Sequence, residues 1–163
     1  MIHENHHQKI TLGLVAARKN SIGVKNKNLI KVKKQEITKI ATKLALNCSA
    51  IHHVLLSSDS IKILNLIKKN KKLTKLKRKK NLAKNSTPML PVIKDAILHF
   101  EKLKKLKVSK LVIFDPTSPL RKMTDIKKAI KIFDKKKPDL LLSVHECEHN
   151  PYFSMLEKKG KYY

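Results

Sequence analysis

Four short apolar runs, separated by amphipathic stretches, constrain most strongly what this chain can fold into. The runs occupy residues 10–17 (ITLGLVAA), 53–57 (HVLLS), 110–114 (KLVIF) and 140–144 (LLLSV). They are short, rich in branched residues and nearly unbroken, which is typical of strands buried on both faces. Between them, apolar residues recur at helical spacing over residues 37–44, 61–67, 92–100 and 126–133. This order predicts an α/β domain with a Rossmann-like parallel or mixed sheet and helices on both faces.

The loop after the first run carries the most informative polar residues. In a parallel sheet the carboxyl ends of the strands lie at one edge, and ligands bind in the loops there. Residues 16–28 (AARKNSIGVKNKN) combine a flexible turn, backbone donors and several cations. Such a segment can cradle phosphate groups, although it contains neither the GxxxxGK[ST] nor the GxGxxG pattern. On spacing alone, a solvated basic loop is an equally good interpretation.

The charge of the chain has two explanations. Its 163 residues, enough for one domain, include 38 Lys and Arg against 12 Asp and Glu, a formal net charge of +26. A phosphate-rich partner would explain this excess, because lysines beside phosphates release counterions. A compositional bias toward lysine also explains it, and we favour this bias because lysines fall on every predicted helix. Aromatic residues, which stack on bases, are only 4% of the chain, so nucleic-acid binding is the less favoured alternative.

Other features exclude several classes of protein. No apolar run approaches the roughly 18 residues of a transmembrane helix, and the N-terminal sequence MIHENHHQK has no apolar signal core. We therefore expect a cytoplasmic protein with no membrane partner, a flexible N-terminus over residues 1–9 and one domain over 10–163. Cys48 and Cys147 lie far apart without CxxC spacing, which favours reduced thiols, with Cys48 buried as a small apolar residue.

Four segments together resemble the acylneuraminate cytidylyltransferases, the CMP-sialic acid synthetase family. They are VAARKNSIGVKNKNL (15–29), LLSSDS (55–60), KRKKNLAKNST (77–87) and FDPTSPLR (114–121), in the family's order. Two further segments, LPVIKDAILHFEK (90–102) and SVHECEHNPYFSMLE (143–157), are similar to members that activate legionaminic acid or related bacterial nonulosonic acids. The resemblance covers nearly all of residues 10–157.

The resemblance implies a fold of the nucleotide-diphosphosugar transferase type and a reaction. CTP and a nine-carbon 2-keto sugar acid, whether sialic, legionaminic or pseudaminic acid, would give the CMP-sugar and pyrophosphate, with Mg²⁺ as cofactor. A homodimer is common in this family, and we leave the oligomeric state open.

The resemblance also assigns nucleotide-binding residues. Arg18 and Lys27 are the expected catalytic residues that clamp the triphosphate, because cations must meet the charge that develops on its oxygens. The remaining expected contacts to CTP are loop donors, a contact to the nucleoside and the lining of the cytidine site: Asn20, Ser21, Asn28, Arg78, Asn85, Ser86 and Thr87. Another interpretation of Arg78 is one more cation in a basic run.

The sugar acid is expected to bind at the turn after the third apolar run. Asp115 is read as a contact to a sugar hydroxyl or to water on the metal, rather than as a general base. Ser118 would donate a hydrogen bond to the sugar. Arg121 either meets the sugar carboxylate or caps the turn, and both interpretations stay open.

The chain departs from the family pattern in three respects. Ile22 replaces the lysine of the SKG motif, and Asn85 replaces the aspartate of the LA-x-D motif. Family members also continue past the end of this chain into a segment with metal-binding aspartates, so the metal ligands stay unknown. A truncated, inactive CTP-binding remnant is therefore a second alternative function.

Three other groups of residues have simpler interpretations. The polar terminus with His3, His6 and His7 could hold a metal, but we favour a solvated segment. The group at His145–His149 contains zinc-ligand types on one strand face, although we favour a strand end leading into the NPYF turn beside the sugar. Asp59 is interpreted as a helix cap.

Overall fold

The computed structural model describes residues 9–20 and 23–144. Its centre is a parallel sheet in the order β5-β4-β1-β6, formed by β1 (Lys9–Ala16), β4 (His53–Ser58), β5 (Leu73–Lys77) and β6 (Lys107–Ile113). One compact unit extends to Lys127, and a second begins at Lys128, within helix α4 (Met123–Lys136). The predicted α/β class with a parallel sheet is confirmed.

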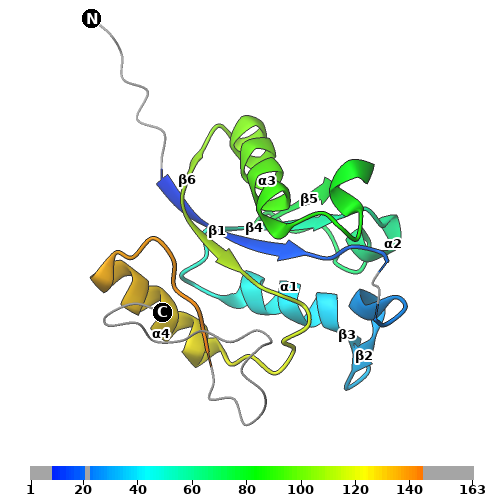
Figure 1. The fold of residues 1–163 in the computed structure, drawn as a ribbon. Coiled ribbons are helices and arrows are strands. Elements are labelled where there is room, and N and C mark those ends of the chain that lie inside the picture. Colours follow the sequence, from blue (N-terminus) through cyan, green and yellow to red (C-terminus); the bar gives the residue numbers. More distant parts are fainter. Residues whose placement is uncertain (1–8, 21–22, 145–163) are drawn as a thin grey trace, which may run out of the picture. The chain divides into compact units, whose positions relative to one another are not determined.

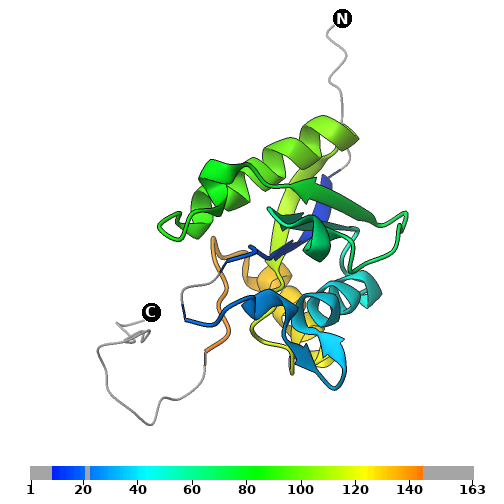
Figure 2. The same cartoon turned by 90° about the vertical axis from the view of Figure 1, so that its right-hand side faces the viewer.

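Helices cover both faces of this sheet (Figure 1). Helix α1 (Ile37–Asn47) packs against β1 and β4 on one face, whereas α3 (Met89–Lys104) contacts β4 and β6 on the other. Figure 2 shows α1 and α3 on opposite sides of the strands in the perpendicular view. The connections contain α2 (Ile61–Leu64), two 3-10 turns, η1 (Lys27–Leu29) and η2 (Lys80–Ala83), and a hairpin of β2 (Lys31–Val32) and β3 (Gln35–Glu36). No helix within residues 9–20 and 23–144 has the length and apolar character needed to cross a membrane.

The core lies on both sides of β1, a strand buried from Ile10 to Val15. On the α3 side, Leu12 and Leu14 of β1 pack with Leu55 of β4 and with Ala96 and Phe100 of α3. Burying a large aliphatic or aromatic side chain contributes about 1.5–3 kcal/mol. The near-continuous apolar sequence of β1 is therefore explained by helices on both of its faces.

The other side of β1 is packed so tightly that a side chain at one glycine position would press on its neighbours. A Cβ atom placed on Gly13 would lie 3.1 Å from Cγ2 of Ile51 and 3.3 Å from Cε2 of Phe114. These contacts are closer than ordinary carbon–carbon separations of about 3.5–4.0 Å. The absence of a side chain at Gly13 lets the segment before β4 and the end of β6 approach the central strand.

The order of the strands determines where the ligand-binding edge lies. From β1 the chain steps outward through β4 to β5, and then crosses to the opposite side of β1 to form β6. The order therefore reverses between β1 and β6, and open α/β sheets bind ligands outside the carboxyl ends of the strands at this point. The loops after β1 and β6, which contain residues 17–28 and 114–121, lie at that edge.

One strand was missed in the sequence. Residues 73–77 lie between the helical patterns of residues 61–67 and 92–100, where no strand was predicted, but they form β5, paired in parallel with β4. Thr74 and Leu76 are buried while Lys75 and Lys77 are exposed, which is the period-two pattern of a strand. The lysines obscured this alternation because lysine is frequent throughout the chain. The helix expected over 61–67 is also shorter, ending at Leu64.

The prediction of a strand at residues 140–144 was wrong. These residues form no strand, and their side chains are exposed, with Leu140 at 69% and Val144 at 62% of full exposure. An unbroken apolar run becomes a buried strand only where other elements cover both of its faces. In the part of the chain that the structure describes, this run is paired in no backbone ladder.

His53 is a half-buried ionisable group at the start of β4. Its ring lies 5.1 Å from the ring of Phe100, and Nε2 is 3.0 Å from Oγ1 of Thr74. Burial, followed by the positive charges of Lys104 and Lys72, lowers the pKa of His53 below its usual value. The folded chain therefore resists protonation of this ring.

A valine at position 13 should destabilise the fold. Gly13→Val adds three carbon atoms where even the first would crowd Ile51 and Phe114, and we expect a loss of about 1–3 kcal/mol in the free energy of unfolding, measured by urea denaturation. Gly23→Ala is the matched control, because a Cβ at Gly23 meets nothing within 4 Å. Equal stability of Gly13→Val and the wild type would contradict the packing described here.

The free energy of unfolding should decrease as the pH is lowered, because of His53. Because the folded pKa is lowered, the unfolded chain takes up a proton first, and the free energy of unfolding declines as pH drops below about 6.5. The decline from this group ends below its folded pKa. Urea denaturation at about pH 7.5 and about pH 5 should therefore show a smaller loss for His53→Gln than for the wild type. His99→Gln, which removes an exposed imidazole from α3, is the control, and an equal loss in all three proteins would disprove this role of His53.

Candidate functional site

Asn28 restrains the loop after β1 through two hydrogen bonds, one from its side chain and one to its backbone oxygen. The Asn28 side chain, 6% exposed, donates from Nδ2 to the backbone oxygen of Arg18 at 2.9 Å. The backbone oxygen of Asn28 accepts a bond from Oγ1 of Thr38 in α1 at 2.7 Å. A buried polar side chain needs such partners, because an unsatisfied one costs about 1–3 kcal/mol. Asn28 therefore connects Arg18 to the helix that packs beneath β1.

The guanidinium of Arg18 reaches a second segment. Arg18 is half-buried, and Nη1 donates to the backbone oxygen of Lys84 at 3.1 Å. That same oxygen accepts the backbone N–H of Thr87 at 3.2 Å, while Oγ1 of Thr87 donates to the backbone oxygen of Asn81 at 3.0 Å. The segment 81–87 is therefore a folded turn against Arg18. This arrangement brings together two of the segments assigned to the nucleotide, residues 17–28 and 77–87.

Arg78 is the buried cation of the site. It is 6% exposed, and it donates from Nε to Oγ of Ser57 at 3.2 Å and from Nη2 to the backbone oxygen of Ser57 at 3.0 Å. Burial lowers its pKa, the charge of Asp59 opposes this shift, and the charge of Arg18 adds to it. An arginine stays charged in proteins. Two neighbouring guanidinium groups, one of them buried, favour a bound anion at this edge.

Asp59 is not the helix cap expected from the sequence. The N-cap of α2 is Ser60, whose Oγ accepts the backbone N–H of Ile63 at 3.4 Å. Oδ1 of Asp59 instead accepts the backbone N–H of Lys19 at 2.7 Å, and its backbone oxygen accepts Nζ of Lys77. Serine is as good a cap as aspartate, so the SSDS sequence does not distinguish between them.

A hollow of about 450 Å³ lies beside Asp59. Its lining combines lysines with the carboxylate and a few uncharged side chains: Lys19, Asn26, Leu29, Asp59, Ser60, Ile61, Lys62 and Lys77. The hollow therefore adjoins the loop after β1 and the ends of both β4 and β5.

The turn after β6 is stabilised by its own residues. Oδ1 of Asp115 accepts the backbone N–H of Thr117 at 2.9 Å and its hydroxyl at 2.8 Å, and the Asp115 carbonyl accepts the N–H of Ser118 at 3.2 Å. The guanidinium carbon of Arg121 lies 5.8 Å from the centre of the Phe114 ring. Such a cation–π contact is one structural role for Arg121, as in the interpretation that it stabilises the turn.

The predicted site residues fall into two groups. Arg18, Asn28, Arg78 and Thr87 are connected through the contacts above, and Asp115, Ser118 and Arg121 follow β6, the strand beside β1. Lys27 begins η1 and is half-buried, whereas Asn20, Asn85 and Ser86 are exposed. Ser21, Ile22, the N-terminal histidines and the His145–His149 group lie outside the described residues. Their predicted roles stay predictions.

Three parts of the site were missed in the sequence: the carboxylate of Asp59, the side chain of Lys77 and the carbonyl of Lys84. Backbone groups leave no mark in a sequence, and Lys77 resembles every other lysine. Only the position of Asp59, directly after a predicted strand, indicated a place at the ligand edge.

The described residues show no ready-made metal centre. Within residues 9–20 and 23–144, no three His, Cys, Asp or Glu side chains gather in a way that could hold an ion. Mg²⁺ usually binds through one or two carboxylates together with substrate phosphates. Asp115 is an exposed carboxylate at this edge, and its chemistry fits that lesser requirement.

Sequence comparison places the chain among known proteins. The family profile described as Cytidylyltransferase matches residues 12–160. Over 143 residues, 88% of this chain and 61% of each relative, the chain is 33% identical to the post-translational flagellin modification protein B of Campylobacter coli and 35% identical to the CMP-N,N'-diacetyllegionaminic acid synthase of Campylobacter jejuni. The chain thus spans about three fifths of the length of these curated relatives.

Solved structures share the fold at low sequence identity. A CMP:2-keto-3-deoxy-manno-octonic acid synthetase complexed with CTP has a TM-score of 0.57 at 11% identity, covering 78% of this chain and 48% of its own. The 4-diphosphocytidyl-2C-methyl-D-erythritol synthase of Anaerococcus prevotii has a TM-score of 0.50 at 15% identity, with 78% and 52% covered. The profile match over most of the sequence confirms the resemblance drawn from its motifs, and the chain belongs to the cytidylyltransferase family.

Proposed function

We propose that this chain binds CTP and transfers its CMP group to a sugar acid of the nonulosonic type, releasing pyrophosphate. The observation that carries the proposal is the convergence of Arg18 and Arg78 at the carboxyl edge of β1 and β4. Membership of the cytidylyltransferase family supports cytosine as the base. The name of the Campylobacter jejuni relative supports a legionaminic-type acid as the acceptor.

The proposed chemistry is an in-line displacement at phosphorus. The anomeric hydroxyl oxygen of the sugar acid forms a bond to the α-phosphorus of CTP and loses its proton to solvent, while the bond from the α-phosphorus to the oxygen that bridges to the β-phosphorus breaks. Negative charge then accumulates on the leaving pyrophosphate and on the non-bridging oxygens. Arg18, with its planar fork of donors, and Lys27, as a mobile point charge, would neutralise that charge.

The other predicted residues have proposed roles around this centre. Arg78 and the turn with Asn85, Ser86 and Thr87 would lie along the cytidine, with Asn20, Ser21 and Asn28 on the loop that holds the phosphates. Asp115, Ser118 and Arg121 would face the sugar acid. Mg²⁺, when bound, would neutralise phosphate oxygens, and Asp115 is the carboxylate proposed to face it or its water.

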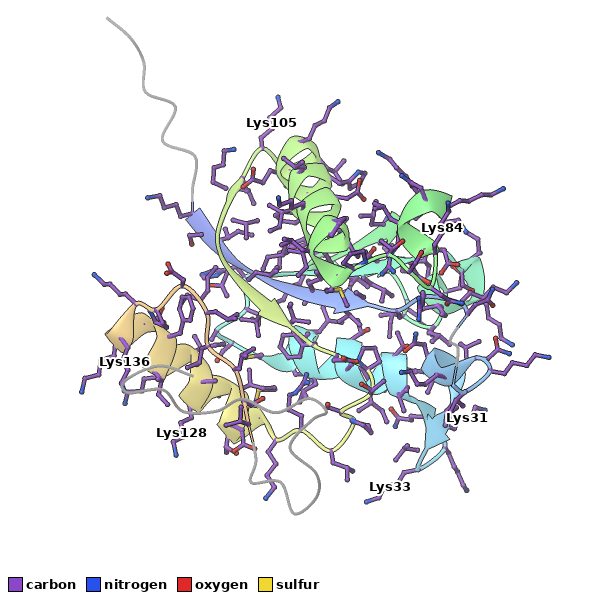
Figure 3. The ribbon with its side chains drawn as sticks, in the orientation of Figure 1. Lys31, Lys33, Lys84, Lys105, Lys128 and Lys136 are labelled. Atoms are coloured by element: carbon purple, nitrogen blue, oxygen red, sulfur yellow. The ribbon has the colours of Figure 1, made fainter. Side chains whose placement is uncertain are left out.

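The distribution of lysines favours this proposal over nucleic-acid binding. Figure 3 shows Lys31 and Lys33 on the β2–β3 hairpin, Lys84 after η2 and Lys105 after α3, extending outward from three different parts of the chain. A nucleic-acid module concentrates its cations along one surface with aromatic residues among them. A lysine-rich composition, which places solvated lysines on several separate surfaces, fits the observed distribution better.

CTP should raise the melting temperature selectively. A ligand that binds only the folded state stabilises it, by about 2.7 kcal/mol at one hundred times its Kd. We expect the 163-residue chain with Mg²⁺ to show a larger shift with CTP than with UTP, ATP or GTP, measured by differential scanning fluorimetry. The selectivity should persist at about 0.5 M salt, which screens exposed charges. Equal shifts that vanish in salt would leave charge as the only cause of binding.

Removing the Arg18 guanidinium should weaken CTP binding. Hydrogen bonds to charged groups contribute about 1.5–3 kcal/mol, so Arg18→Met should raise the Kd for CTP by about 10- to 100-fold, measured by isothermal titration calorimetry. Lys128→Met removes one positive charge from an exposed position on α4 and is the matched control. If both variants weaken binding equally, Arg18 has no specific role.

A further inference from the structure

Asp59 connects three segments at the ligand-binding edge of the sheet. It follows β4 directly, its carboxylate accepts the backbone N–H of Lys19 after β1, and its carbonyl accepts the Lys77 side chain at the end of β5. We infer that Asp59 is a positioning residue, which holds the start of the loop after β1, residues 17–20, in the shape that binds a nucleoside triphosphate. This inference rests on the proposed function.

The contact to Lys19 lies at the point where the loop leaves the sheet. Lys19 follows Arg18 directly, and at 2.7 Å the bond between its N–H and the carboxylate is a short, charge-assisted one. The backbone oxygen of Arg18 accepts the bond from Asn28. The peptide that carries Arg18 is therefore restrained from both sides, by Asn28 at its carbonyl and by Asp59 one residue later.

The charge of Asp59 makes this role unusual. The carboxylate is close enough to Arg78 to raise the pKa of that guanidinium, so it also lies close to the proposed anion site. A negative charge there repels a triphosphate, and by Coulomb's law alone its removal would strengthen CTP binding. A positioning role predicts the opposite, because the loop then loses its restraint. The two explanations therefore differ in the sign of the effect.

Local helix formation does not require Asp59. Ser60 caps α2, and the backbone N–H of Ser60 is bonded to Oγ of Ser58 at 3.0 Å. The carboxylate is only half-buried, at the wall of the hollow lined by Lys19 and Lys77. Truncation of Asp59 should consequently change the loop much more than the fold.

The test compares two substitutions at Asp59. Asp59→Ala removes the acceptor, and we expect about tenfold weaker CTP binding together with faster amide hydrogen exchange in peptides covering residues 17–28. Asp59→Asn keeps an oxygen that can accept the Lys19 N–H, so its CTP affinity should stay within about threefold of the wild type. Isothermal titration calorimetry and exchange mass spectrometry provide the two measurements. Asp125→Ala, which removes an equal charge from an exposed position on α4, is the control.

Each other outcome overturns the inference. If Asp59→Ala binds CTP as tightly as the wild type or more tightly, the carboxylate acts only through its charge or not at all. If both substitutions lower the melting temperature without changing CTP affinity, its role is structural. If the wild type itself shows no CTP-selective binding, the proposed function fails, and the nucleotide role of Asp59 fails with it.

Discussion

The burial of β1 on both faces is the constraint on which the rest of the structure depends. Leu12 and Leu14 pack toward α3, while Gly13 leaves room for Ile51 and Phe114 on the other side. A strand covered in this way has no freedom to slide by one residue, because its side chains would exchange faces. The register with β4 and β6 is fixed as a result, and the loops that leave these strands emerge at a defined edge.

That edge of the sheet holds the residues of the candidate site in place. The ends of β1, β4 and β5 are parallel neighbours, so Arg18, Asp59 and Arg78 come from three different loops and still lie together. Buried polar contacts complete the arrangement: Asn28 holds the Arg18 carbonyl, and the Ser57 oxygens hold Arg78. A family of nucleotide-binding enzymes can use such an edge because the sheet supplies rigidity while the loops supply charge.

The sequence predicted the fold class, the three strands β1, β4 and β6, and the loops that form the ligand-binding edge. Apolar periodicity determines these features, and this pattern can be recognised even in a lysine-rich chain. The strand β5 was missed because lysines occupy its exposed positions, and residues 140–144 were misread because burial depends on neighbours rather than on apolar character. Asp59, Lys77 and the Lys84 carbonyl were not predicted for another reason: their contacts join residues far apart in the chain, and each contact involves a backbone group.

The bond from Arg18 to the Lys84 carbonyl has a consequence for the entropy of the proposed CTP binding. A guanidinium carries five N–H donors in a rigid plane, so one bond to a carbonyl orients the group and leaves further donors for phosphate oxygens. An arginine already held in one rotamer loses less conformational freedom when a ligand arrives, a saving of about 0.5–1.5 kcal/mol for a long side chain. The turn of residues 81–87 thus restrains the Arg18 side chain, and in the proposed function this contact would preorganise Arg18 for the phosphates.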